Sequence, residues 1–215
     1  EASLAAIDDA GLEPRDIDGI IPYAVGSTVA EDLVTNLGIA DLRYSATTPM
    51  GGASCVAALQ SAAMAVETGV ASHVLCAIGR NGYSRSRVGS RLRQMPQFKT
   101  VAEFEWPSGA LAPAQLYAPM ARRHMELYGT TSEQFGEIAV VMRSHAMLND
   151  NALMQKPITL EDHQESRMIS DPFRLLDCCL ESDGGTAVIV SGVERARDLT
   201  HHPTRIPRLP PSAPP

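Results

Sequence analysis

The first eighty residues alternate between helical and strand-like patterns, and this alternation constrains the fold more than any other feature of the chain. Apolar residues recur at helical spacing in three stretches, residues 1–11, 27–38 and 53–69. Short apolar runs typical of buried strands lie between and after them, at residues 17–25, 42–47 and 73–78. Helices and strands in alternation predict right-handed crossovers and a layered α/β sheet. A further apolar run at 186–191 predicts a last strand.

The alternation stops at Arg80. Residues 80–111 are rich in Gly, Ser and Arg and have no long apolar period, which predicts a loop. Helices are then expected at 113–128 and 132–148, with a short one after Thr159, its expected N-cap. The pattern therefore predicts a sheet domain and a helical excursion, followed by a disordered proline-rich tail. Their boundaries are 1–80 with 176–199 for the sheet domain, 81–175 for the excursion and 200–215 for the tail.

Composition excludes several classes of protein. The chain is 44% hydrophobic with a net charge of −7, so neither wholesale disorder nor general nucleic-acid binding is expected. An aromatic content of 5% favours a helix-rich layered fold over a β-sandwich or barrel. The spacings of the four cysteines fit neither a disulfide framework nor a zinc site, and no apolar run approaches the length of a membrane span. We therefore expect a soluble, cytoplasmic protein without a metal site.

The first candidate site is the segment Pro49-Met-Gly-Gly-Ala-Ser-Cys55, which predicts a strand, a glycine turn and a helix start. The backbone N–H groups and the positive dipole end at the start of a helix favour a thiolate and stabilise an oxyanion, so Cys55 is a candidate nucleophile. In the alternative interpretation, Gly51 and Gly52 only form the turn and Cys55 is a small buried residue.

The second candidate site is a run of basic residues with no acidic residue among them: Arg80, Arg85, Arg87, Arg91, Arg93 and Lys99. Guanidinium groups with Gly and Ser between them form a suitable setting for phosphate groups. The alternative is a solvated loop, or an interface with acidic residues of a partner subunit.

The third segment is Asp177-Cys-Cys-Leu-Glu-Ser-Asp183-Gly-Gly. Asp183 and the two glycines are expected to form a tight turn before the last strand. The adjacent cysteines Cys178 and Cys179 are poor disulfide partners because a bridge between neighbours strains the peptide.

Three segments in order resemble the thiolase superfamily, in its sterol-carrier-protein-X or lipid-transfer-protein branch. Residues 51–65 resemble the nucleophile helix of thiolases, and residues 121–130 with the following helix are similar to their loop domain. Residues 156–162, 166–169 and 176–184 resemble the segment that closes the first half of a thiolase. The resemblance extends over about residues 1–199.

The resemblance implies the N-terminal half of a thiolase-like layered fold. This half is a mixed five-stranded sheet with helices on both faces, plus a helical loop domain. It also implies an acyl-CoA substrate, with coenzyme A as part of that substrate and no other cofactor, and a homodimer or a hetero-oligomer with a partner subunit. Arg85, Arg87, Arg91 and Arg93 are then expected to bind the phosphates of coenzyme A.

The match departs from the family at the nucleophile. In the favoured register Gly52 takes the place of the reactive cysteine, and in the other register Cys55 does. The first indicates retro-aldol cleavage without a covalent step, and the second Claisen-type acyl transfer through Cys55.

Three further expectations concern the extent of the chain. The family's opening strand, which would come before residue 1, is expected to be missing. The family's second half, with its Gly-His-Pro histidine and second cysteine, is expected to be missing. Six of the fifteen prolines lie in the last fifteen residues, and with the start at Glu1 they indicate cut or altered ends. The alternatives to an enzyme are therefore a non-catalytic acyl-CoA-binding or lipid-binding scaffold subunit, or an inactive truncated product.

Overall fold

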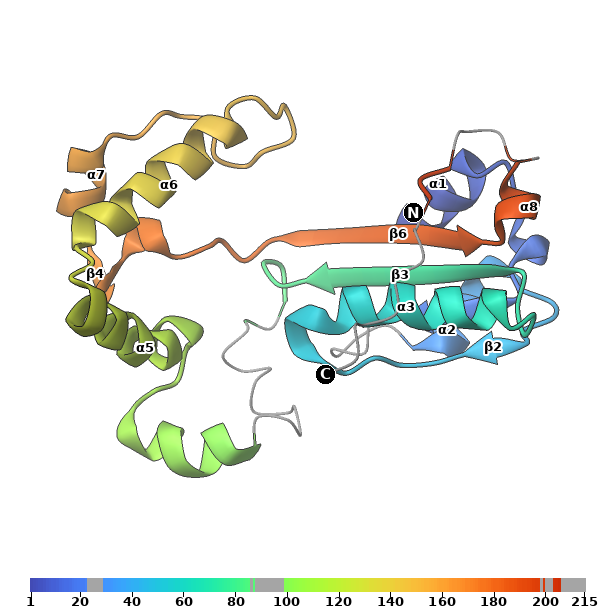
Figure 1. Ribbon diagram of the computed structural model, residues 1–215, viewed down its shortest axis with the longest axis horizontal. Coiled ribbons are helices and arrows are strands. Elements are labelled where there is room, and N and C mark those ends of the chain that lie inside the picture. Colours follow the sequence, from blue (N-terminus) through green and yellow to red (C-terminus); the bar gives the residue numbers. More distant parts are fainter. Residues whose placement is uncertain (23–28, 86, 88–98, 198, 200–202, 206–215) are drawn as a thin grey trace, which may run out of the picture. The chain divides into compact units, whose positions relative to one another are not determined.

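The computed structural model describes residues 1–22, 29–85, 87, 99–197, 199 and 203–205 (Figure 1). The chain divides into two compact units. Residues 1–81 and 183–215 contain the sheet and are called the sheet unit, and residues 82–182 are called the helical unit. Within the described ranges, no helix has both the length and the apolar character needed to cross a membrane.

The sheet unit is built on a mixed four-stranded sheet in the order β2-β1-β3-β6. Its strands are β1 (Gly19–Pro22), β2 (Tyr44–Ser45), β3 (His73–Asn81) and β6 (Asp183–Ser191). β1 is parallel to β2 and β3, whereas β6 is antiparallel to β3, and Figure 1 shows β3 and β6 as two long neighbouring strands. Each of the four apolar runs predicted as strands contributes one of them. The fifth strand implied by the family resemblance is not among the described residues.

Helices cover both faces of this sheet because successive residues of a strand point to opposite sides. On one face, α3 (Ser54–Glu67) packs its row of small residues against the strands. The buried cluster there consists of Ile21, Ala58, Ala62, Ala65, Ala71, Val74 and Val190. On the other face, α1 (Ala2–Asp9) and α2 (Ala30–Leu37) flank a second cluster. That cluster consists of Ile7, Ile17, Ile20, Ile39, Leu75 and Ala77.

A carboxylate fixes the start of β3. Asp18 accepts hydrogen bonds from the backbone N–H groups of Ser72 and His73 at 2.8–2.9 Å, which joins the residue before β1 to the residues that open β3. Gly19 lets the two strands approach closely, because a Cβ at this position would lie 2.7 Å from Cγ2 of Val74. The sheet unit also contains the 3-10 turns η1 (Pro14–Asp16) and η2 (Gly51–Ala53) and the short helix α8 (Val193–Ala196).

The tight turn predicted at residues 183–185 was wrong. Asp183, Gly184 and Gly185 are the first residues of β6 and pair with Asn81, Arg80 and Gly79 of β3. Extending the β3–β6 ladder satisfies the backbone hydrogen-bonding groups of these residues, and the long-range pairing therefore overrides the local turn preference of Asp-Gly-Gly.

The helical unit contains the two long helices expected from the sequence, α5 (Pro113–Tyr128) and α6 (Ser132–Ala146), the latter two residues shorter than predicted. The predicted loop at 80–111 includes the end of β3 and two short helical turns, η4 (Val101–Glu105) and η5 (Trp106–Ser108). A hairpin of β4 (Met168–Ser170) and β5 (Phe173–Arg174), followed by the 3-10 turn η6 (Leu175–Asp177), was not predicted.

Capping side chains set the starts of two helices in this unit. The predicted cap of α7 (Leu160–Glu165) is confirmed, because the Asp162 N–H donates to the Thr159 hydroxyl and the Thr159 N–H donates to the Asp162 carboxylate at 2.7 Å. The hydrogen bonds that the Thr159 N–H and hydroxyl donate to the Asp162 carboxylate lower the pKa of Asp162. At α6 the Thr131 N–H donates to the side-chain oxygen of Gln134 at 2.9 Å, which satisfies one backbone donor at the helix start.

Candidate functional site

The beginning of α3 is held by a pair of short polar contacts. The buried Ser54 hydroxyl accepts a hydrogen bond from the Met50 N–H at 2.9 Å, and the Thr48 hydroxyl donates to the Ser54 carbonyl at 3.0 Å. Gly51 has a φ of +60°, a conformation that L side chains rarely adopt, so this turn requires glycine there. The sequence therefore builds a fixed turn that leads directly into the helix.

Gly52 and Cys55, the two candidates for the nucleophile position, both lie at this entrance. Gly52 is exposed, its φ is not positive, and an added Cβ would meet no atom within 4 Å, so the fold itself does not require glycine at this position. Cys55 is an exposed, free thiol on the first turn of α3. The interpretation of Cys55 as a buried residue was wrong, because Ser54 and Ala58 are the residues that the helix turns inward here.

A small cavity of about 80 Å³ lies next to Cys55, between α3 and the sheet. Its walls are Cys55, Ala58 and Leu59 from α3 and Ile21, Cys76, Ala77, Ile78, Thr186 and Val188 from the sheet. Cys76 is the second thiol at this cavity. Burial raises its pKa to about 11, and its Sγ lies 3.8 Å from the Ala58 carbonyl oxygen. A neutral thiol is a poor nucleophile, so Cys76 contributes to packing.

The four arginines expected to bind phosphate have different positions. Arg85 is exposed. Arg87 forms an ion pair with Glu181 at 3.0 Å, and its guanidinium lies over the Tyr83 ring at 5.2 Å from the centroid. Arg91 and Arg93 lie outside the described residues. Within the helical unit, the structure therefore brings Arg87 to an acidic side chain of the same chain, and the phosphate-binding role of these arginines stays a prediction.

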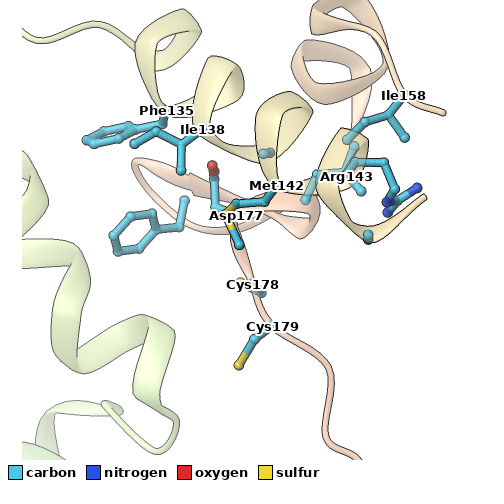
Figure 2. A pocket seen from close by; sticks show the side chains of 12 residues that line it. Phe135, Ile138, Met142, Arg143, Ile158, Asp177, Cys178 and Cys179 are labelled. Atoms are coloured by element: carbon cyan, nitrogen blue, oxygen red, sulfur yellow. The ribbon is translucent and has the colours of Figure 1, made fainter. Parts of the chain in front are cut away.

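A second concave feature, a groove of about 460 Å³, lies within the helical unit (Figure 2). One wall is α6, which contributes Phe135, Ile138, Ala139, Met142, Arg143 and Ala146. The other residues of the groove are Ile158, Phe173, Leu176, Asp177, Cys178 and Cys179. Burial, with Asp177 and Cys179 adding to the effect, raises the pKa of Cys178, which keeps this thiol protonated. The groove is thus an apolar surface with an arginine and two thiols at its edges.

The polar residues behind the groove were missed by sequence reasoning. His163 is fully buried, and its Nε2 lies 2.7 Å from a carboxylate oxygen of Asp177. The Arg174 N–H donates to the other oxygen of Asp177 at 2.7 Å. Gly136 of α6 leaves room for this pair, since a Cβ there would lie 2.8 Å from Nδ1 of His163. Fourteen residues separate His163 from Asp177, and no local motif links them.

Comparisons with known proteins decide the family. No family model matches the chain. A steroid side-chain-cleaving aldolase from Thermomonospora curvata is 47% identical over 96% of this chain and 54% of that protein. A 17-hydroxy-3-oxo-4-pregnene-20-carboxyl-CoA lyase from Mycobacterium tuberculosis is 42% identical over 96% of this chain and 55% of its own length. An acetyl-CoA acetyltransferase from Methanothermobacter thermautotrophicus is 33% identical over 96% of this chain and 54% of the transferase. The chain belongs to the thiolase superfamily.

A solved structure shares the fold of this chain. The structure of an Ltp2-ChsH2(DUF35) aldolase matches with a TM-score of 0.81 and 47% identity, over 94% of this chain and 51% of that chain. The chain spans about half the length of the curated relatives it matches. The resemblance to sterol-carrier-type thiolases read from the sequence is confirmed, and the thiolase-like chain is similar to aldolases as well as to acyltransferases.

Proposed function

We propose that this chain is part of a retro-aldolase that shortens the side chain of a steroid acyl-CoA thioester. The observation that carries the proposal is Gly52. It occupies the nucleophile position of thiolases in the favoured register, at an exposed helix entrance where the fold leaves room for a side chain. A thiolase needs a thiol there to form an acyl-enzyme, whereas a retro-aldol cleavage forms none. Similarity to a steroid side-chain-cleaving aldolase supports this choice.

The proposed reaction balances without an oxidant or reductant. A base removes the proton of a hydroxyl on the β-carbon of the thioester, and the oxygen electrons form a ketone. The bond between the β-carbon and the α-carbon breaks, its electron pair forms a thioester enolate, and the α-carbon then takes up a proton. The products are a ketone and a shortened acyl-CoA. Preorganised N–H donors at a helix start are suited to an enolate oxygen, because its negative charge develops during the reaction.

We also propose that the chain works in a hetero-oligomer with a DUF35-type protein. The matching solved structure is a complex that carries DUF35 in its name. The helical unit exposes many large apolar side chains, among them Phe104, Tyr128 and Leu148, each more than 70% accessible. Large exposed apolar side chains of this kind would be covered if the partner bound the helical unit, and we propose that it does.

The test uses the protein co-expressed with a DUF35-type partner and the 17-hydroxy-3-oxo-4-pregnene-20-carboxyl-CoA thioester. Mass spectrometry then follows the ketone and the short acyl-CoA. We expect both products in equal amounts, with activity retained in Cys55→Ser. Loss of activity in that variant, together with an acyl group on Cys55 in the unmodified protein, would instead establish Claisen-type acyl transfer. Absence of both products in the assembled complex would refute the retro-aldolase proposal.

A further inference from the structure

We propose that the small cavity beneath the first turns of α3 binds the alkyl part of the short acyl group and limits it to three carbons. This assignment rests on the proposed function and adds a specificity pocket to it. The pocket belongs to the sheet unit, and every residue of its wall is described.

The cavity has a closed end and an open side. Ile21 and Ala58 are buried and form the closed end, where α3 lies against β1 and β3. Cys55, Thr186 and Val188 are the exposed members of the wall, so the cavity opens beside the first turn of α3 and the adjoining part of β6. Figure 1 shows α3 lying along the sheet at this position. An acyl group entering from the open side would keep its carbonyl near the start of α3.

The volume sets the size of the group. An apolar protein cavity of about 150 Å³ binds benzene, which has six carbon atoms, so one of about 80 Å³ holds roughly three non-hydrogen atoms. In the proposed reaction the bond between C17 and C20 of the steroid thioester breaks. C20 carries one methyl group and the thioester carbonyl, so the released product is propanoyl-CoA. Its three acyl carbons match the cavity, whereas a longer acyl chain would exceed it.

The chemistry of the wall agrees with an alkyl group. Most of the lining is aliphatic, and the buried Cys76 thiol already lies near the Ala58 carbonyl oxygen. A cavity that is lined in this way offers an alkyl group contacts and offers water few hydrogen-bonding partners. The small side chain of Ala58 is what keeps the cavity open on the side of the helix.

The test measures how variants change acyl-chain preference in the assembled complex. The dissociation constants of acetyl-CoA, propanoyl-CoA and butanoyl-CoA are measured by calorimetry for Ala58→Val, which fills the cavity, and for Cys76→Ala, which enlarges it. Ala63→Val is the matched control, because it makes the same change on α3 at a residue that is not part of the wall. One methylene in an apolar pocket changes selectivity by about 10-fold or more.

We expect Ala58→Val to weaken propanoyl-CoA about 10-fold relative to acetyl-CoA, and Cys76→Ala to improve butanoyl-CoA relative to propanoyl-CoA by a similar factor. Ala63→Val should leave the order unchanged. If Ala58→Val does not fold, as judged by thermal unfolding, Cys76→Ala decides alone. The pocket assignment is overturned by an unchanged order in the folded variants, or by an unmodified complex that binds none of the three. A complex that shows the shifts but does not cleave the steroid thioester contradicts the proposed function and leaves the pocket in place.

Discussion

The sheet unit and the helical unit are stabilised by different means. In the sheet unit, two clusters of Ile, Val, Leu and Ala side chains lie on either face of the strands, several of them with no exposed surface. Among the described residues of the helical unit, Ala118 is the one hydrophobic residue that is buried. Polar contacts contribute to that unit alongside the packing of partly buried side chains such as Phe135 on Phe173. They include the His163–Asp177 hydrogen bond, the Thr159 capping box and the ion pair between Arg122 and Asp171.

This difference indicates separate responses to perturbation. Burial of aliphatic side chains is non-directional and tolerates small adjustments, whereas a buried polar contact requires its partner in one geometry. The sheet unit should therefore lose stability in proportion to the apolar volume removed. The helical unit should lose stability when a single hydrogen-bonding partner is removed, or when a side chain is added where two helices pack closely.

The largest expected effect is a core truncation in the sheet unit. Leu75 has no exposed surface and lies in the cluster beneath α1 and α2, so Leu75→Ala should lower the free energy of unfolding by about 4 kcal/mol. Leu153 in the helical unit is 70% exposed, so Leu153→Ala should change the free energy of unfolding by less than about 0.5 kcal/mol. Urea unfolding of both variants measures the difference. Equal losses would mean that Leu153 is packed in solution and that the comparison between the units is wrong.

The next effect is the loss of a buried polar partner in the helical unit. His163→Ala leaves a carboxylate oxygen of the nearly buried Asp177 without its partner, which should destabilise this unit by about 3 kcal/mol. Hydrogen exchange resolved by segment measures the effect. Protection should fall in α6, α7 and η6 and persist in β3 and β6. The exposed His145 provides the control, since His145→Ala removes a histidine of α6 without a buried partner. An equal loss of protection in β3 and β6 would show that the units unfold together.

Local signals in the sequence predicted much of the fold. Apolar runs located all four strands of the sheet, because a buried strand needs a continuous apolar segment. Pro113 and Gly129 bounded α5, since proline suits the first helical turn and glycine the left-handed residue after the last one. The cap at Thr159 followed from the same kind of local rule.

Contacts distant in sequence account for the errors. Asp183-Gly-Gly becomes strand because β3 is available to pair with it, and His163 meets Asp177 only after the hairpin brings them together. The exposure of Cys55 depends on which side of α3 faces the sheet. At the candidate site, the sequence correctly placed Gly52 and Cys55 at one helix start, but the cavity beside Cys55 requires residues from four elements.

A smaller effect tests how closely the helical unit is packed. A Cβ on Gly136 would lie 2.5 Å from Cδ1 of Leu160, so Gly136→Ala should cost about 2 kcal/mol by forcing α6 and α7 apart. Gly184 of the sheet unit has open space around it and an ordinary φ, so Gly184→Ala should be neutral or slightly stabilising. Thermal unfolding compares the two variants. If Gly184→Ala lowers the unfolding temperature and Gly136→Ala does not, the conclusion that Gly136 has close neighbours and Gly184 has none is wrong.

The smallest effect concerns the buried histidine of the sheet unit. Burial lowers the pKa of His73. The nearby carboxylates of Asp18 and Asp16 oppose this shift, whereas Arg195 adds to it. Nδ1 of the ring lies 2.8 Å from the Ser191 hydroxyl. The unfolded chain therefore binds a proton more readily than the folded one at pH values between the lowered pKa and the ordinary value of 6.5. The stabilising contribution of the neutral ring is complete above pH 6.5 and declines as the pH falls below it. Hydrogen exchange of β3 and β6 amides at several pH values measures this decline, and His73→Gln should flatten it. If protection declines with the same slope in His73→Gln, other groups cause the pH dependence and His73 does not contribute to it.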